Sequence, residues 1–242
     1  MIFQAHYPDP GDNSQPQSRP ALHLQQGFSL VEMSIVLVIL GVLLGGLIAP
    51  FSTQLDSSKR KGADAQLDDI HNALLGFAAN NGRLPCPATA ASNGLAAPNA
   101  ATLACTSYSG FVPAVTLGLN GAVDANGLLL DPWLNPVRYT LTSANAGAFS
   151  NLLILGLTPD LQACEQAACT SVLTTTAVAV VFSPGDDGTT TTSPDQLENL
   201  DGDTLFVTRP YSEQTGAEFD DHIIWVSLNT LVYNLVKAGQ IN

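Results

Sequence analysis

The chain has 242 residues, of which 45% are hydrophobic and only 12% are charged. This length holds one or two ordinary domains, and the apolar content is enough for a sizeable core, which excludes a disordered tail. Asp and Glu total 21 against 8 Lys and Arg, so the formal net charge is −13. A surface of this charge repels phosphate groups, and we therefore expect no direct nucleic-acid partner.

The N-terminal region contains a long apolar segment over residues 28–51. Its 24 residues include a single ionisable side chain, that of Glu32. A helix rises ~1.5 Å per residue and a bilayer core is ~30 Å thick, so this segment is predicted to be a transmembrane helix. A secretory signal has a basic start and a shorter apolar stretch of ~7 to 15 residues. Here the apolar stretch is longer, and residues 1–27 do not provide a basic start. The polar residues 1–27 are instead predicted to be a cleaved leader.

Glu32 requires an explanation, because a carboxylate in a membrane-spanning helix costs roughly 2.5 to 3.5 kcal/mol unless it finds a partner. It lies close to the predicted helix N-terminus, where the helix dipole favours an anion. A cut after Gly27 would also create a free amino group on Phe28, either in the same chain or in a neighbour, that could pair with the carboxylate. The alternative is that Glu32 reaches the lipid headgroups.

The order Gly27-Phe28-Ser29-Leu30-Val31-Glu32, followed by an unbroken apolar helix, resembles the class III signal of type IV prepilins and type II secretion pseudopilins. The resemblance implies cleavage between Gly27 and Phe28 by a prepilin peptidase and N-methylation of Phe28. It also implies assembly with other pilin or pseudopilin subunits through the apolar helices. In such a filament, Glu32 would neutralise the Phe28 amine of an adjoining subunit.

Two signals disagree about the side of the membrane on which the C-terminal part lies. Arg19 precedes the apolar segment and Lys59, Arg60 and Lys61 follow it, which favours a cytoplasmic C-terminal part. An even set of four cysteines beyond the segment favours an oxidising compartment instead. We give the cysteines more weight and predict a single-pass inner-membrane protein with a periplasmic head, which joins a pilus or pseudopilus after assembly.

The cysteines are Cys86, Cys105, Cys164 and Cys169, and their spacing lacks the paired Cys-x-x-Cys pattern of a zinc site. Of the three possible disulfide pairings, we favour the two local ones, Cys86 with Cys105 and Cys164 with Cys169. The first would close the Ala-, Asn- and Pro-rich segment between them and stabilise the fold by roughly 3 kcal/mol. Free buried thiols remain the alternative.

Residues 52–82 are predicted to continue the helix as an amphipathic segment. Leu67, Ile70 and Leu74 follow one another at spacings of three and four, which is typical of one helical face. Asn80, Asn81 and Gly82 are then plausible helix-stop residues.

Residues 83–242 are predicted to form a globular periplasmic head. Residues 83–127 lack periodicity and indicate an ordered loop held by cysteine. Residues 131–139 indicate a turn that enters a strand, and they are similar to the Asp-Pro-Trp-Gly-Asn-Pro stretch of pseudopilins, with Leu134 in place of Gly. Further strands are expected over residues 152–157, 177–183, 204–208 and 223–226, and a last helix is expected after Ser227. The prediction is an α+β, pilin-like fold in which the long helix packs on an antiparallel sheet.

The acidic loops are the clearest candidate for a metal site. Asp186 and Asp187 lie on one loop, and Glu198, Asp201 and Asp203 lie on another. Carboxylates are the ligands that Ca²⁺ prefers, although the spacing does not match an EF-hand loop. Calcium is therefore a possible cofactor, and two solvated, turn-forming loops are the alternative.

No catalytic motif is recognisable. Asp220, Asp221 and His222 suggest a catalytic group, but no Ser or Cys partner is identifiable, so a structural turn is preferred. We therefore expect a structural subunit, a minor pilin or pseudopilin of a type IV pilus or type II secretion filament, rather than an enzyme. The alternative is a membrane-anchored periplasmic binding module or enzyme that joins no filament.

Overall fold

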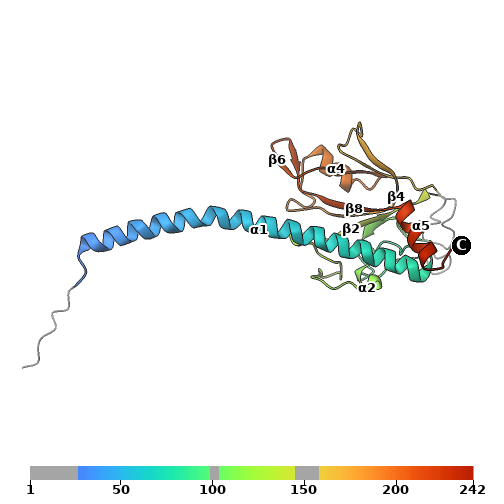
Figure 1. Cartoon of the computed structure of the whole chain (residues 1–242), viewed down its shortest axis with the longest axis horizontal. Helices are drawn as coiled ribbons and strands as arrows, with labels where there is room; N and C mark the ends of the chain where they lie inside the picture. Colours follow the sequence, from blue (N-terminus) through green and yellow to red (C-terminus); the bar gives the residue numbers. More distant parts are fainter. Residues whose placement is uncertain (1–26, 99–103, 145–157, 242) are drawn as a thin grey trace, which may run out of the picture. The chain divides into compact units, whose positions relative to one another are not determined.

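The computed structural model of the chain describes residues 27–98, 104–144 and 158–241, with the side chains of residues 46–53 left out (Figure 1). Most of the predicted leader, residues 1–26, and the predicted strand over residues 152–157 lie outside the described residues. The chain divides into two compact units, Met1–Pro50 and Phe51–Asn242.

The first helix, α1 (Leu30–Asn81), begins two residues later and ends one residue earlier than the predicted range of 28–82. From residue 63 to residue 78 it buries one face, at spacings of three and four residues, made of Ala63, Leu67, Ile70, Leu74 and Ala78. The helix ends where Gly82 adopts a φ of 69° and donates its backbone N–H to the carbonyl of Ala78 at 2.8 Å. Glycine is suited to this left-handed position because it has no Cβ.

The transmembrane helix predicted over residues 28–51 is not found among the described residues. Within the part of the chain that the structure describes, no helix has the length and apolar character that crossing a membrane requires. All the described side chains from residue 27 to residue 45 are exposed.

The head is built around one six-stranded sheet. Its strands are β1 (Ser109–Phe111), β2 (Arg138–Leu141), β3 (Leu161–Cys164), β4 (Val172–Ser183), β5 (Leu205–Val207) and β8 (His222–Ser227). The order is β1-β2-β4-β3-β5, and β8 pairs with β4. Val180 of β4 pairs with both Thr140 and Trp225, whereas Ala177 pairs with both Leu161 and Ser227. The long strand β4 therefore has β8 on one edge and, on the other edge, β2 followed by β3.

The sheet is mixed, so the prediction of a purely antiparallel sheet is wrong. All other strand pairs are antiparallel in the described part of the sheet, but β3 and β5 run parallel, with Ala163 opposite Phe206. The chain reverses direction at the β3–β4 hairpin and again through α4 (Pro194–Leu200). A connection that contains a helix can return the chain parallel to an earlier strand, whereas a tight hairpin cannot.

The remaining elements are α2 (Ala114–Leu117), β6 (Ser212–Gln214), β7 (Ala217–Phe219) and α5 (Leu228–Lys237). Strand β1 and helix α2 lie within residues 83–127, for which the sequence predicts a loop. The last helix begins as predicted, because the Oγ atom of Ser227 accepts a hydrogen bond from the Thr230 N–H at 3.2 Å. Gly239 follows the helix with a φ of 72°.

The main core lies between α1, the sheet and α5. Leu67, Ile70 and Leu74 of α1 pack in one cluster with Val181 of β4 and Leu231 of α5. A second, smaller cluster that includes Leu161, Val180, Phe182 and Phe206 lies on β3, β4 and β5. From Ala179 to Phe182, residues of β4 alternate between these clusters, as expected for a strand with both faces buried. The fold is therefore α+β, with α1 against one face of the sheet.

Candidate functional site

The N-terminus of α1 is closed by two reciprocal hydrogen bonds. The backbone N–H of Ser29 donates to Oε2 of Glu32 at 3.3 Å, and the N–H of Glu32 donates to Oγ of Ser29 at 3.2 Å. This arrangement is a capping box, in which a Ser or Thr and a Glu three residues later satisfy each other's backbone donors. The Ser-x-x-Glu spacing is a local signal for this cap, and the sequence predictions did not include it. Glu32 thus has a partner within its own chain.

The residues on both sides of the predicted cleavage bond precede the helix. Gly27, Phe28 and Ser29 are non-helical, and all three are exposed. The side chain of Phe28 is 78% exposed. A bond between Gly27 and Phe28 in this conformation is open to an enzyme that must surround the backbone.

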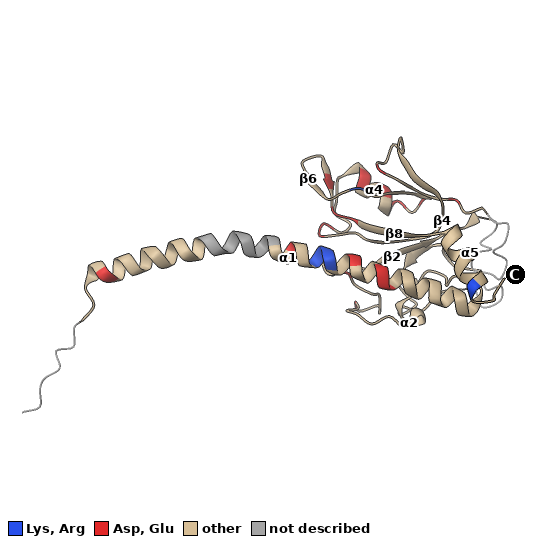
Figure 2. Ribbon diagram, in the orientation of Figure 1, with Lys and Arg blue, Asp and Glu red and all other residues tan. Residues whose placement is uncertain are grey.

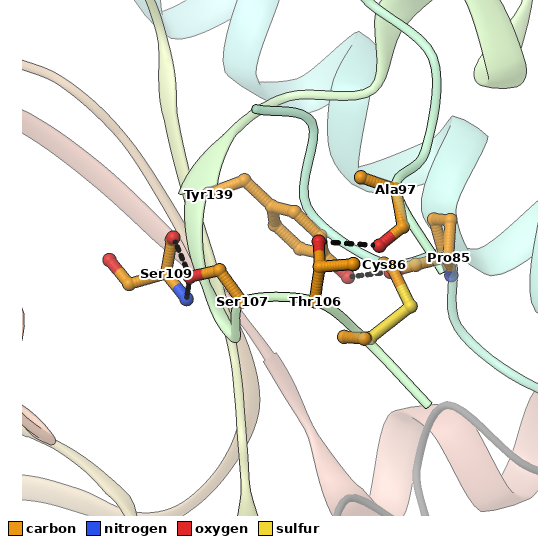
Figure 3. The surroundings of a disulfide bond; sticks show 8 residues. Pro85, Cys86, Ala97, Thr106, Ser107, Ser109 and Tyr139 are labelled. Atoms are coloured by element: carbon orange, nitrogen blue, oxygen red, sulfur yellow. Dashed lines mark hydrogen bonds between the residues drawn. A yellow bond between two sulfur atoms is a disulfide. The ribbon is translucent and has the colours of Figure 1, made fainter. Parts of the chain in front are cut away.

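The cysteines form the two pairs that the sequence favours, Cys86 with Cys105 and Cys164 with Cys169. Figure 3 shows the first pair beside a set of hydrogen bonds that fix the segment after α1. The Tyr139 hydroxyl donates to the carbonyl of Pro85 at 3.0 Å, and Thr106 Oγ1 donates to the carbonyl of Ala97 at 2.9 Å. The first disulfide therefore closes the loop that follows α1, and the Tyr139 hydrogen bond joins the start of that loop to strand β2.

The turn over residues 131–136 is organised by the buried side chain of Asp131. Its Oδ1 atom accepts from the N–H groups of Trp133 at 2.9 Å and Asn135 at 2.8 Å, and its Oδ2 atom accepts from Ser183 Oγ at 2.5 Å. Burial raises the pKa of Asp131, although these hydrogen bonds oppose the shift. Leu134 adopts a φ of 72° and is 69% exposed. A leucine therefore occupies a left-handed position that favours glycine.

The five predicted metal ligands separate into two groups. Glu198, Asp201 and Asp203 come together, with one carboxylate oxygen of each within 4.8 Å of the others. Burial and the neighbouring carboxylates of Asp201 and Asp203 raise the pKa of Glu198. This group offers three oxygen ligands of the kind that Ca²⁺ takes, on an exposed surface.

Asp186 and Asp187 lie instead beside Asp220. The Oδ2 atom of Asp220 accepts from the N–H groups of Asp186 at 2.6 Å and Asp187 at 3.2 Å. The side chain of Gln196 also contacts Asp220. Burial, followed by the charge of Asp220, raises the pKa of Asp187 to about 6. No pattern in the sequence indicates this contact, because Asp220 is more than thirty residues away from the other two aspartates.

Asp221 and His222 have different partners from each other. The Oδ2 atom of Asp221 accepts from the Asn199 side chain at 2.6 Å, and burial raises the pKa of Asp221 to about 8. His222 Nδ1 lies 2.7 Å from Oδ1 of Asp64 on α1, and its ring lies against that of Trp133. His222 therefore joins the start of β8 to α1, and Asp221, the residue before β8, contacts α4.

Comparison with known families identifies the N-terminal region. The family described as the prokaryotic N-terminal methylation motif matches residues 22–48. The chain carries a prepilin-type signal. No curated protein and no solved structure matches the chain.

The prepilin-type signal confirms the resemblance that was based on Gly27, Phe28 and Glu32. Its match ends at residue 48, so it covers the start of α1 and none of the head. The signal supports a type IV pilin-like or pseudopilin-like protein that undergoes membrane-associated export.

Proposed function

We propose that this protein is a structural subunit, a minor pilin or pseudopilin, of a type IV pilus or a type II secretion filament. A prepilin peptidase cuts after Gly27, Phe28 becomes the methylated N-terminus, and the subunit joins others through the apolar part of α1. The pilin-like head then lies on the periplasmic side, and its role is in assembly rather than catalysis. The observation that carries this proposal is the match of residues 22–48 to the methylation motif.

The surface of the first part of α1 supports assembly through that segment. Its large apolar side chains are at least 47% exposed from Leu30 to Leu44. Exposed apolar patches of this kind are rare on monomeric proteins and mark interaction sites. The corresponding helices of neighbouring subunits in a filament would cover these side chains.

Cleavage is tested by intact mass and N-terminal sequencing of the full chain, expressed with and without a prepilin peptidase. We expect a chain that begins at methylated Phe28 only when the peptidase is present. Gly27→Arg places a charged side chain at the bond and should block cleavage, whereas Gly41→Ala, inside the helix, should not. A chain that keeps residues 1–27 in both conditions would contradict the proposal and leave the binding module or enzyme without a filament as the better explanation.

The role of Glu32 in assembly can be separated from its role in the capping box. Glu32→Gln keeps an oxygen that accepts the Ser29 N–H but removes the charge, whereas Glu32→Val removes both. If Glu32 pairs with the amine of a neighbouring Phe28, both variants should be cleaved normally and both should be lost from filaments. Filament incorporation of Glu32→Gln at the wild-type level would assign Glu32 to capping alone.

A further inference from the structure

The unit Phe51–Asn242 contains a cleft between α1 and the β6–β7 hairpin, with a volume of about 280 Å³. Its walls come from α1, the turn at Trp133, the loop after β4, α4 and the hairpin. Figure 2 shows acidic residues on α1, on α4 and on the β6 hairpin, with a basic band on the neighbouring stretch of α1. The cleft is distinct from the N-terminal signal and from the Glu198 group.

The charge of the cleft is strongly negative. Six carboxylates of the described residues line it, those of Asp56, Asp186, Asp187, Glu213, Glu218 and Asp220. The same described lining has one cationic side chain, Arg60. An anion has no favourable place in such a cleft, whereas a cation gains from several carboxylates at once.

Aromatic rings form a second part of the lining, and one of them already holds a cation. Trp133, Tyr211 and Phe219 all line the cleft. The guanidinium carbon of Arg60 lies 3.2 Å from the centroid of the Tyr211 ring. Among the described residues, Arg60 forms no ion pair with a carboxylate. The cleft therefore already binds one guanidinium group through an aromatic face, and within the described lining that group pairs with no carboxylate.

Asp187 is a carboxylate that lacks a donor for one of its oxygens. Its Oδ1 atom is buried and has no hydrogen-bond partner within the described part of the chain. Its neighbour Asp220, in contrast, accepts two backbone N–H groups. The side chains of Thr191 and Gln196 hydrogen-bond to the Asp187 carboxylate, so the preference of the cleft for a cation comes from the number of carboxylates that line it.

We propose that this cleft binds an arginine side chain from a basic segment of a partner protein. Arginine fits better than lysine because its planar guanidinium stacks on aromatic rings and donates to two carboxylate oxygens at once. A second copy of this chain is disfavoured as the partner, because each copy carries a net charge of −13. Arg60 occupies part of the same cleft and competes with the incoming side chain for Tyr211.

The test uses the full chain in neutral detergent and a blocked tetra-arginine peptide. Trp133 lines the cleft, and the chain has 2 tryptophans, so Trp225→Phe leaves Trp133 as the single fluorescent reporter. We expect a saturable change in Trp133 fluorescence when the peptide binds. The affinity measured in this way should fall about tenfold as the salt concentration rises from about 0.05 M to about 0.5 M. Tetra-lysine and spermidine should bind at least about fivefold more weakly, because they lack the planar donor.

Three variants in this reporter background separate binding from stability. Glu213→Gln combined with Glu218→Gln removes two carboxylates from the hairpin and should weaken binding about tenfold. Glu165→Gln, an exposed change outside the cleft, is the control and should have no effect. Arg60→Gln should tighten binding about threefold, because it removes the internal competitor.

Several results would overturn the proposal. These are the absence of saturable binding, equal loss of affinity in the hairpin and Glu165→Gln variants, and weaker binding by Arg60→Gln. Equal affinity for spermidine or tetra-lysine would reject an arginine-specific site in favour of general attraction to cations. Sedimentation that shows dimers, lost when tetra-arginine is added, would show that a second copy is the occupant.

Discussion

The two ends of α1 differ in how far their apolar side chains are buried within the chain. From residue 35 to residue 45 the segment is apolar on all sides, and every described side chain is exposed. From residue 63 to residue 78 the apolar residues are confined to one face, and Leu67 and Leu74 on that face are at most 3% exposed. A helix with one apolar face completes its packing within its own chain, whereas a helix that is apolar on all sides needs other molecules around it.

The largest effect should come from cutting back the buried face of α1. Leu74→Ala leaves a cavity in the main core and should lower the free energy of unfolding by about 3 kcal/mol. Leu37→Ala, in the exposed segment, should change it by less than about 0.5 kcal/mol and instead weaken filament assembly. Urea unfolding of the full chain in detergent measures the free energy of unfolding of both variants. A similar loss for the two variants would mean that the first segment also packs within the chain.

The disulfide that follows α1 should have an effect almost as large. Cys86→Ser with Cys105→Ser opens a loop between cysteines 19 residues apart and should cost about 3 kcal/mol. Cys164→Ser with Cys169→Ser opens a loop with a separation of 5 and should cost about 2 kcal/mol. Thermal unfolding should rank the pairs in this order. The reverse order would argue that the first loop contributes little to the packing around the buried part of α1.

Protonation should distinguish the head from the exposed part of α1. Asp221 has a pKa of about 8 in the fold, above the value near 4 of an unfolded aspartate. The folded state therefore holds its proton more tightly, so this contribution is fully present below about pH 4 and is lost as the pH rises towards 8. Asp187, with a pKa of about 6, acts in the same direction over a lower range.

We expect the melting temperature to fall by several degrees between about pH 5 and about pH 8.5. Asp221→Asn keeps an acceptor for Asn199 and should remove most of this slope. Glu32→Gln lies in the exposed segment and serves as the control that keeps the slope. An unchanged slope in Asp221→Asn would assign the pH response to other groups.

Leu134 provides a smaller test, because it is an exposed apolar residue within the head. Leu134→Gly relieves a left-handed leucine and should stabilise the fold by about 1 kcal/mol, or raise the melting temperature by about 2 to 4 °C. Leu197→Gly is the matched control, since Leu197 is exposed on α4 and glycine lowers helix stability by about 1 kcal/mol. A lower melting temperature in both variants would show that Leu134 packs in solution.

The smallest expected effect is that of calcium on the Glu198 group. If Ca²⁺ binds there, adding it should raise the melting temperature slightly and EDTA should reverse the change. Glu198→Gln combined with Asp203→Asn should abolish the response, and Asp186→Asn should not, because Asp186 lies beside Asp220 instead. A melting curve that is identical with Ca²⁺ and EDTA would dismiss this site.

The sequence predicted best what neighbouring residues determine. The C-terminal stop of α1 and the Ser227 cap depend on residues within one turn of each other, and both could be predicted from the sequence. The parallel pairing of β3 with β5 was not, because the path of the chain through α4 decides it. Short strands such as β6 and β7 carry no periodic signal of their own.

The candidate sites follow the same rule. Gly27, Phe28 and Glu32 lie within six consecutive residues, so the prepilin-type signal that contains them could be recognised without the fold. The metal ligands were predicted as one set because both loops are acidic, but only three of the five come together. The separation arises because Asp220, from a distant segment, accepts the backbone N–H groups of Asp186 and Asp187. No local pattern contains that contact.

The capping box at Ser29 and Glu32 has a consequence for the order of events during maturation. Both of its residues lie after the bond between Gly27 and Phe28, so the start of the helix does not depend on the leader. Cleavage at that bond would release the leader and leave only Phe28 ahead of the cap. The mature subunit would then begin filament growth with its first helical turn already formed, and removal of the leader would change what the helix can contact without requiring it to fold again.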